Sequence, residues 1–302
     1  MNQQNDIPLP SVDRAATPAL LYEMMRSFTV LARTLNLTQA VEALGSTRQT
    51  VRRHITQLET AMGGKLFEIE HRRYGLTEAG TRALAPAQRL LDQGEVWYSG
   101  NFDDVGGMMR FTYDSGAGMQ YLQQEVPMSA VWSGRSDLLR TAVKAWTQAE
   151  GMLEAPAMDI VRPYVMGYRE ISDGWICVEV GERSFYSSFF GWAQARSSLG
   201  RNLNQFPGGE AIATLANAPF REITANAAVR LDQVMTRTRF SPEAPLETVI
   251  FDRLLFGVRL PDQSPAIISV VDRPCEVRIE GVPQSALKEV PDKARVDFEV
   301  PV

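Results

Sequence analysis

Residues 44–59 read LGSTRQTVRRHITQLE and place three arginines within six positions. Successive residues of an α-helix lie about 100° apart around its axis, so Val51, Ile55, Leu58 and Met62 fall on one narrow stripe. The opposite side gathers polar side chains, namely Gln49, Arg52, Arg53 and Thr56. The pattern predicts a helix that packs through its apolar stripe and leaves guanidinium and amide groups facing outward.

Two shorter stretches before this helix are its expected supports. Residues 19–36 repeat apolar side chains at spacings of three and four, which is typical of an amphipathic helix. A second helix follows, with Thr38 as its expected N-cap and Gly45 at its end, and Ser46 or Thr47 can cap the third helix. A helix, a glycine turn and a helix with one polar face form the helix-turn-helix pattern.

The polar face of the third helix suits DNA. Arginine can fork onto guanine, glutamine onto adenine, and threonine or arginine onto phosphate. We therefore expect contacts to the major groove and the phosphates from Thr38, Ser46, Thr47, Arg48, Gln49, Thr50, Arg52, Arg53 and Gln57. The face alone is equally compatible with a solvated basic surface helix, because charged helix faces are common.

A hairpin is expected after the third helix. Residues 65–70, KLFEIE, alternate like a strand, and residues 71–75, HRRYG, end in a glycine that can adopt positive φ. Leu76 leads into Thr77, which can cap another helix. Such a hairpin is a wing, and we expect Arg72 and Arg73 at its tip to contact the phosphate backbone or the minor groove.

Residues 37–80 resemble the winged helix-turn-helix of LysR-type transcriptional regulators. The matching features are Thr-x-Ala-x-x-x-Leu in the second helix, Gln-Thr-Val, Ile-x-x-Leu-Glu, Gly-x-Lys-Leu-Phe and the closing Leu-Thr-x-Ala-Gly. The resemblance implies a sequence-specific regulator of transcription that binds an operator in double-stranded DNA. Two departures affect the DNA contacts: Arg52 stands where the family usually has serine, and residues 68–70 lack the arginine that usually follows Leu-Phe.

The helix expected from Glu78 to about Gly94 has an apolar side made of Ala83, Leu84, Ala87, Leu90 and Leu91. In the family the corresponding helix pairs with its twin, so the resemblance implies a homodimer here, or a tetramer built from dimers. Pro86 should kink this helix or weaken one of its turns. A helix that packs only on its own chain remains the alternative.

Charge and histidine content narrow the function. Residues 46–75 hold six basic and three acidic side chains, whereas the 302-residue chain has a net charge of −5. A basic patch on an acidic body is typical of a DNA-binding module joined to another domain. Both histidines, His54 and His71, lie in the first quarter, which excludes a histidine base or histidine-ligated metal from the larger part of the chain. We expect no catalytic residue, metal or cofactor, and an enzyme with a regulatory head is the least favoured hypothesis.

The expected location is the cytoplasm. The first residues are polar and lack the basic start and apolar centre of a signal peptide. No apolar run is long enough to cross a bilayer, so no membrane partner is expected. Cys177 and Cys275 lie far apart in the sequence, which favours a reducing compartment over a disulfide framework.

The last two hundred residues do not show the repeated strand–helix units of the usual LysR-type effector domain. Residues 164–180 and 248–272 read as strands, and residues 225–236 as a helix. A strand pair, then helices, then a longer antiparallel set is the order of a PAS-type sensor domain, and the stretch from Asp173 to Leu203 resembles the opening of one. This weak resemblance spans about 110 residues.

Aromatic residues crowd one region of the expected sensor domain. A ligand site there would be lined by Trp175, Phe185, Tyr186, Phe190 and Trp192. Aromatic clusters are more often plain core, and that reading is the more favoured of the two. The ligand would be a small-molecule effector, and a protein partner is the other expectation for this domain.

The predicted fold is multidomain, with an all-α winged helix-turn-helix followed by an α+β, PAS-like antiparallel sheet with helices. The expected segments are a flexible tail (1–17), a DNA-binding domain (18–76), a linker or dimerisation helix (77–95), a connector (96–135), the PAS-like domain (136–275) and a C-terminal extension (276–302). The leading function is a DNA-binding regulator controlled by the sensor-like domain. In the alternative, that domain only mediates oligomerisation or partner docking and binds no small molecule.

Overall fold

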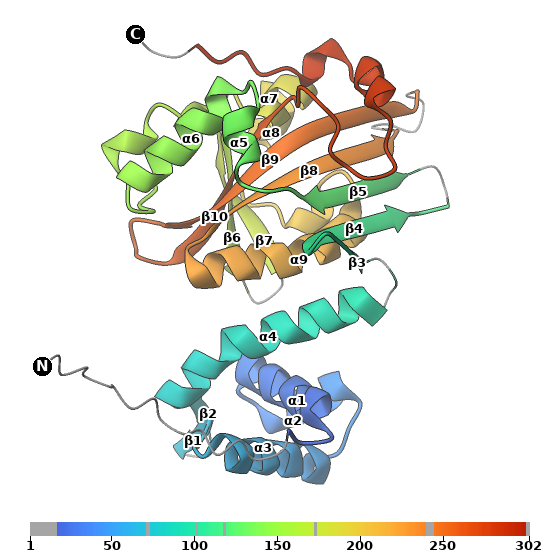
Figure 1. Ribbon diagram of the computed structural model, residues 1–302. Helices are drawn as coiled ribbons and strands as arrows, with labels where there is room; N and C mark the ends of the chain where they lie inside the picture. Colours follow the sequence, from blue (N-terminus) through green and yellow to red (C-terminus); the bar gives the residue numbers. More distant parts are fainter. Residues whose placement is uncertain are drawn as a thin grey trace, which may run out of the picture. The chain divides into compact units, whose positions relative to one another are not determined.

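The computed structural model describes residues 17–70, 73–98, 100, 102–116, 119–171, 174–239 and 245–299. The chain divides into two compact units, Met1–Leu91 and Asp92–Val302, whose elements are labelled in Figure 1. Apart from Thr17, the expected flexible tail lies outside the described residues. Within the described ranges, no helix combines the length and the apolar character needed to cross a lipid bilayer.

The first unit contains three helices and a two-stranded hairpin, and a fourth helix begins in it. The elements are α1 (Leu21–Thr34), α2 (Leu37–Leu44), α3 (Arg48–Met62), β1 (Phe67–Glu70), β2 (Arg73–Leu76) and α4 (Glu78–Tyr98). Strands β1 and β2 pair antiparallel, with Phe67 opposite Leu76 and Glu70 opposite Arg73. This order of elements is the expected winged helix-turn-helix.

A single apolar core holds these elements together. Phe28 and Leu31 of α1 are each 1% exposed, and they share the core with Ala40 of α2 and Val51 of α3. Hydrophobic side chains at helical spacing on three short helices can be buried only against one another, which explains why none of the three needs to be stable alone. Met62, predicted to complete the apolar stripe of α3, is 54% exposed because it lies in the last turn, beyond the core.

The start of α4 is fixed by close backbone packing to the segment between α3 and β1. Thr77 caps α4, since its Oγ1 accepts a hydrogen bond from the Gly80 N–H at 3.0 Å and donates one to the Lys65 carbonyl at 2.6 Å. A side chain at Gly80 would collide with the carbonyl group of Leu66. The closing Leu-Thr-x-Ala-Gly therefore has a steric reason for its glycine. Pro86 lies inside α4, which continues to Tyr98.

The second unit is built on one sheet. Its strands are β3 (Phe102–Val105), β4 (Met108–Asp114), β5 (Gln120–Glu125), β6 (Val165–Ile171), β7 (Gly174–Val180), β8 (Val229–Thr238), β9 (Glu247–Arg259) and β10 (Pro265–Asp272). They lie in the order β3-β4-β5-β8-β9-β10-β6-β7, and every neighbouring pair is antiparallel. The helices of this unit are α5 (Ala130–Ser133), α6 (Asp137–Gln148), α7 (Phe185–Phe190), α8 (Trp192–Arg196) and α9 (Gly209–Asn226).

Two sequence expectations for this unit are wrong. Residues 96–135 are more than a connector with one expected strand at 108–113: β4 confirms that strand, but β3 and β5 accompany it and extend the sheet through pairing of β5 with β8. Residues 225–236 are not a helix, because most of them lie in strand β8, and the helix α9 ends at Asn226. The buried pair Arg230 and Asp232 puts polar side chains on an inner face, which hides the alternation by which a strand is recognised.

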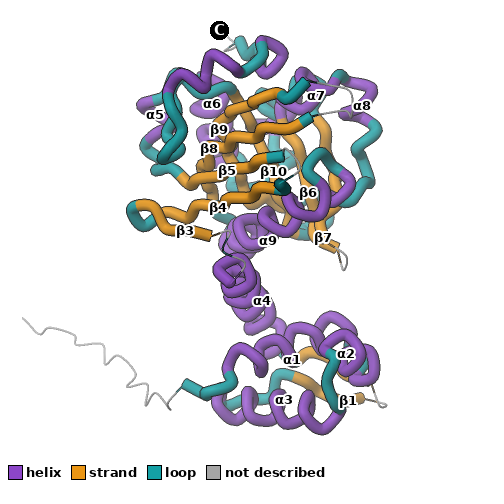
Figure 2. Tube along the Cα trace, turned by 90° about the vertical axis from the view of Figure 1, so that its right-hand side faces the viewer, coloured by secondary structure: helices purple, strands orange, loops and turns teal. Residues whose placement is uncertain are grey.

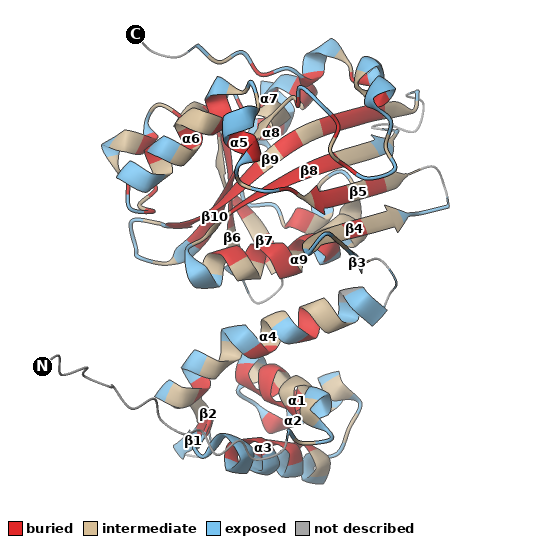
Figure 3. Cartoon of the chain, in the orientation of Figure 1, coloured by how far each residue is buried: buried red, intermediate tan, exposed pale blue. Residues whose placement is uncertain are grey.

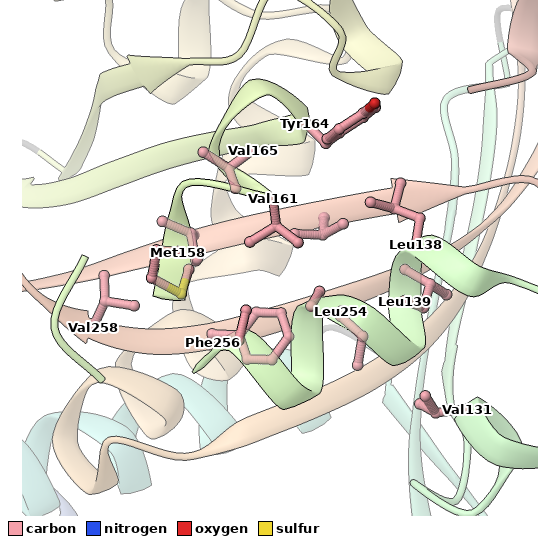
Figure 4. Close-up of a cluster of buried hydrophobic side chains, with 14 of the residues drawn as sticks. Val131, Leu138, Leu139, Met158, Val161, Tyr164, Val165, Leu254, Phe256 and Val258 are labelled. Atoms are coloured by element: carbon pink, nitrogen blue, oxygen red, sulfur yellow. The ribbon is translucent and has the colours of Figure 1, made fainter. Parts of the chain in front are cut away.

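The sheet is covered on both faces, as Figure 2 shows with α5 and α6 on one side and α7 and α8 on the other. On the first face, Leu254 and Phe256 of β9 pack against Leu138 and Leu139 of α6 (Figure 4). On the second face, Leu255 of the same strand joins the cluster that includes α9. Alternate residues of β9 therefore serve two separate cores, which is why β9 reads as a nearly continuous apolar run.

The described part of the C-terminal extension adds no strand to the sheet. Residues 276–299 contain two short 3₁₀ helices, η4 (Gln284–Glu289) and η5 (Asp292–Ala294), and no strand. Ile279 and Ala294 nevertheless are buried in a core cluster with Val249 and Ile250. This segment covers part of the sheet through side chains and does not pair with it as a strand.

Carboxylates lie on the α6 side of the sheet. Asp252 of β9 and Asp272 of β10 are directly opposite in register. The Asp272 carboxylate accepts a 2.6 Å hydrogen bond from the hydroxyl of Ser136, which also caps α6 by accepting a hydrogen bond from the Leu139 N–H. Burial raises the pKa of Asp252 to about 6, although a hydrogen bond from the amide of Gln233 works in the opposite direction.

We predict that Gly80→Ala destabilises the amino-terminal unit by about 1–3 kcal/mol, because the added methyl group overpacks a backbone contact. Hydrogen exchange of the α1–α3 amides, measured in the full chain, reports this local stability. Gly64→Ala is the matched control, since nothing lies within 4 Å of a side chain added at Gly64. Equal protection factors in the two variants would contradict the packing argument.

We predict that the stability of the second unit falls between about pH 4 and pH 6, in part because of Asp252. Its folded-state pKa lies above its ordinary value of 3.8. The folded chain therefore holds the extra proton in this window, and stability is lost as the pH rises. The Asn side chain of Asp252→Asn cannot ionise, so this variant should escape the loss of unfolding free energy, which for Asp252 is on the order of 3 kcal/mol by pH 7. Urea unfolding at several pH values tests this. If the free energies of unfolding of the two proteins change equally with pH, the prediction is contradicted.

Candidate nucleic-acid interface and ligand cavity

The turn between α2 and α3 is closed by specific caps. Asn36, and not Thr38 as expected, caps α2, because its Oδ1 accepts hydrogen bonds from the N–H groups of Thr38 and Gln39 at 2.9 and 3.3 Å. Thr47 caps α3 by accepting a 3.1 Å hydrogen bond from the Thr50 N–H. The C-cap Gly45 is left-handed, with φ 57°. Local hydrogen bonds therefore fix where α3 begins.

Helix α3 is buried along one side. Val51, Ile55 and Leu58 are 0%, 8% and 4% exposed. His54 is buried on the same side, where its Nδ1 lies 2.8 Å from the hydroxyl of Ser27 in α1. This hydrogen bond explains a histidine that the sequence left without a role, and Figure 3 shows the exposed residues on the remaining side of the helix.

The end of α3 is tied to the wing by a buried carboxylate. Glu59 accepts hydrogen bonds from the N–H groups of Leu66 and Phe67 at 3.0 and 3.3 Å, and its second oxygen lies 2.7 Å from the Lys65 ammonium group. Backbone N–H groups that begin a strand would otherwise be buried without partners, which costs about 1–3 kcal/mol each. Glu59 was absent from the predicted site, although it belongs to the Ile-x-x-Leu-Glu motif.

The outward residues form a continuous polar surface, which we call the α3 face. Nine predicted DNA contacts lie on α2, α3 and their turn, and two of them, Ser46 and Thr50, are partly exposed. The other seven are exposed, namely Thr38, Thr47, Arg48, Gln49, Arg52, Arg53 and Gln57. The Arg48 guanidinium group donates a 2.9 Å hydrogen bond to the Thr38 hydroxyl. This contact links α2 to α3 across the turn.

The wing brings a mixed charge to the first unit. Arg73 is exposed, whereas Arg72 lies outside the described residues. Glu68 and Glu70 of β1 are also exposed, and Glu70 is opposite Arg73 in the hairpin. The acidic base of the wing that the sequence indicated is thus at the surface, and it would repel phosphate groups near β1.

The second unit contains a cavity of about 200 Å³ between the sheet and the α7–α9 segment. Of the five predicted ligand-site residues, Phe185, Tyr186 and Phe190 of α7 line this cavity. Trp175 is 1% exposed in the core, with its ring 5.2 Å from the ring of Phe220, and Trp192 is 44% exposed; neither lines the cavity.

Sequence analysis missed the polar lining of the cavity. Tyr121, Tyr168, Ser269 and Arg253 line it from four different strands. Burial raises the pKa of the Tyr121 and Tyr168 phenols, so both remain neutral hydrogen-bond donors near neutral pH. The charged Arg253 within the apolar run TVIFDRLLFGV was the one available signal.

Neither unit offers a metal site in its described part. Within the described ranges, no group of three or more His, Cys, Asp and Glu side chains is arranged to hold a metal ion.

Three helices, a capped turn and a hairpin wing define the winged helix-turn-helix class of nucleic-acid-binding domain. Residues 22–81 match the family model described as "Bacterial regulatory helix-turn-helix protein, lysR family". Residues 22–81 therefore carry the helix-turn-helix that this family model describes.

Solved structures similar to this chain include oxidized OxyR of Corynebacterium glutamicum, with 26% identity, coverage of 26% of each chain and a TM-score of 0.26. Another is the CbnR_DBD–DNA complex, with 29% identity, 26% of this chain, 88% of that chain and a TM-score of 0.24. The BenM_DBD/catB site 1 DNA complex has 24% identity, the same coverages and a TM-score of 0.25. The match thus spans about a quarter of the OxyR chain. A comparison with curated proteins found no match.

We predict that Arg53→Ala weakens binding to duplex DNA while the fold persists, because Arg53 is exposed on α3 and supports no core contact. If Arg53 contacts phosphate, the slope of log affinity against log salt should fall by about 0.9. If it contacts a base, the loss should be about 1–3 kcal/mol and depend on sequence. Filter binding or a gel shift measures both quantities.

Arg259→Ala is the control for that measurement, because it removes the same charge from an exposed position in the second unit. Identical DNA affinity of Arg53→Ala and the unaltered chain would remove Arg53 from the interface.

Proposed function

We propose that this protein is a sequence-specific transcriptional regulator that binds an operator in double-stranded DNA through the α3 face. The observation that supports this most directly is the one-sided burial of α3: its apolar stripe lies in the core, whereas Arg48, Gln49, Arg52 and Arg53 face outward. A helix held in this way can enter the major groove without unfolding its own domain. We propose the cytoplasm as its location, because a bacterial-type regulator of transcription acts where the genome lies.

We propose further that the protein acts as a homodimer through α4. Leu90 and Trp97 of α4 are 53% and 69% exposed. Large apolar side chains on one helix are costly to leave in water, and a second copy of the helix would cover them. Two DNA-binding domains also double the base contacts that one small domain can make. Tetramers are compatible with the same helix pairing.

The second unit is proposed to be a PAS-like sensor that controls DNA binding. The chain order supports this, since the strand pair β6–β7 is followed by α7–α9 and then by three antiparallel strands. These five strands are neighbours in the larger sheet, in the order β8-β9-β10-β6-β7. The cavity between this part of the sheet and α7 supports a small-molecule effector over a purely oligomeric role.

Selection from a random duplex library with the full chain tests the proposal. We expect enrichment of a pseudo-palindromic sequence whose half-sites are separated by one or more helical turns, about 10 bp each. A footprint that protects both half-sites would support the dimer. A library that shows no enrichment, with equal affinity for all duplexes, would overturn sequence-specific regulation.

A further inference from the structure

Among the described residues that line the cavity in the second unit, one side chain is charged. Arg253 of β9 is 12% exposed at its side chain and lines the cavity. Its Nη2 lies 3.3 Å from Oδ2 of Asp232, while its Nε is buried and has no hydrogen-bond partner among the described residues. A buried guanidinium N–H without a partner is costly, so the site is incomplete without a further acceptor.

Arg253 shares its one carboxylate partner, Asp232, with Arg230, and the contact with Arg253 is the longer of the two. Asp232 is fully buried and lies closer to Arg230, at 2.7 Å from its Nε. Arg230 also lies near Glu125 and Glu222, at 3.4 and 3.9 Å. No second carboxylate lies within 4.0 Å of Arg253 in the described chain. Arg253 therefore meets the carboxylates of this cluster only through its 3.3 Å contact with Asp232, and the other two carboxylates lie beside Arg230.

Apart from hydroxyl groups such as that of Ser269, most of the remaining lining of the cavity is apolar or aromatic. The rings of Phe185 in α7 and Phe251 in β9 have their centres 5.3 Å apart. The ring centres of Tyr186 and Phe190, both in α7, are 4.6 Å apart. A volume of about 200 Å³ is small for a ligand site. An apolar cavity of about 150 Å³ can hold benzene, so this one has room for a single ring and a short polar substituent.

We propose that the cavity binds a small monocarboxylate with a ring-sized apolar body, and that its carboxylate pairs with Arg253. Guanidinium and carboxylate groups match in shape as well as in charge, and the low polarity of the surrounding rings strengthens their pairing. This inference rests on the proposed sensor function, because it names the class of molecule that the sensor would detect.

Titration calorimetry of the full chain with phenylacetate tests the inference. We expect one site per chain with a Kd below about 1 mM. Phenylacetamide has nearly the same shape but no charge, and we expect it to bind at least about tenfold more weakly, as the loss of a charged hydrogen bond implies. Equal affinities for the two compounds, or no binding of phenylacetate, would overturn the proposal without any change to the protein.

Variants of the protein then test whether Arg253 is the group that pairs with the carboxylate of the ligand. Arg253→Gln should weaken phenylacetate binding at least about tenfold and weaken phenylacetamide binding much less, so that the preference for the carboxylate is lost. Asp232 keeps its 2.7 Å partner Arg230 in this variant, so the sheet retains a paired carboxylate. Arg169→Gln is the control, because Arg169 is 39% exposed at its side chain and does not line the cavity. Tight phenylacetate binding by Arg253→Gln would overturn the assignment.

DNA binding measured in parallel separates the ligand class from the sensor function. Phenylacetate binding through Arg253 without any change in operator affinity would support the ligand class and count against the sensor. A neutral metabolite that alters operator affinity, with no binding of phenylacetate, would support the sensor and overturn the ligand class.

Discussion

The amino-terminal domain depends on the one-sided attachment of α3. Burial of Val51, Ile55 and Leu58 contributes roughly 1.5–3 kcal/mol for each side chain. The Glu59 carboxylate then joins the last turn of α3 to the first N–H groups of the wing. Because these contacts use one side of the helix and its end, the side chains on its outward side are not needed to hold the helix in place. A chain that stabilises a helix in this way can vary the outward residues with little loss of stability.

The second unit depends on a different constraint, because successive side chains of a strand point to opposite faces of the sheet. In β9, Leu254 and Phe256 enter an apolar core beneath α6, whereas Phe251 and Arg253 lie on the other face and line the cavity. One strand thus supports a close-packed core on one face and a polar, incompletely filled site on the other. The rigid core holds the guanidinium group of Arg253 in place, which a loop could not do as firmly.

Local signals account for what was predicted correctly. The wing and the strands β9 and β10 each depend on a few neighbouring residues, so short-range spacing is sufficient to indicate them. Strand β8 was mistaken for a helix because Ala228, Leu231 and Met235 happen to follow helical spacing. Its pairing with β5 and β9 decided the outcome, since long-range hydrogen bonds override a weak local preference.

The sequence alone determined that one amphipathic helix exposes arginine, threonine and glutamine side chains, because the angle between residues in a helix is set by local geometry. Only the tertiary structure decided which residues surround the cavity. Tyr121, Arg253 and Ser269 lie far apart in the chain or on separate strands, and they meet because β5, β8, β9 and β10 are neighbours in one sheet. Sheet neighbours are chosen by the burial of whole faces, which no short stretch of sequence encodes.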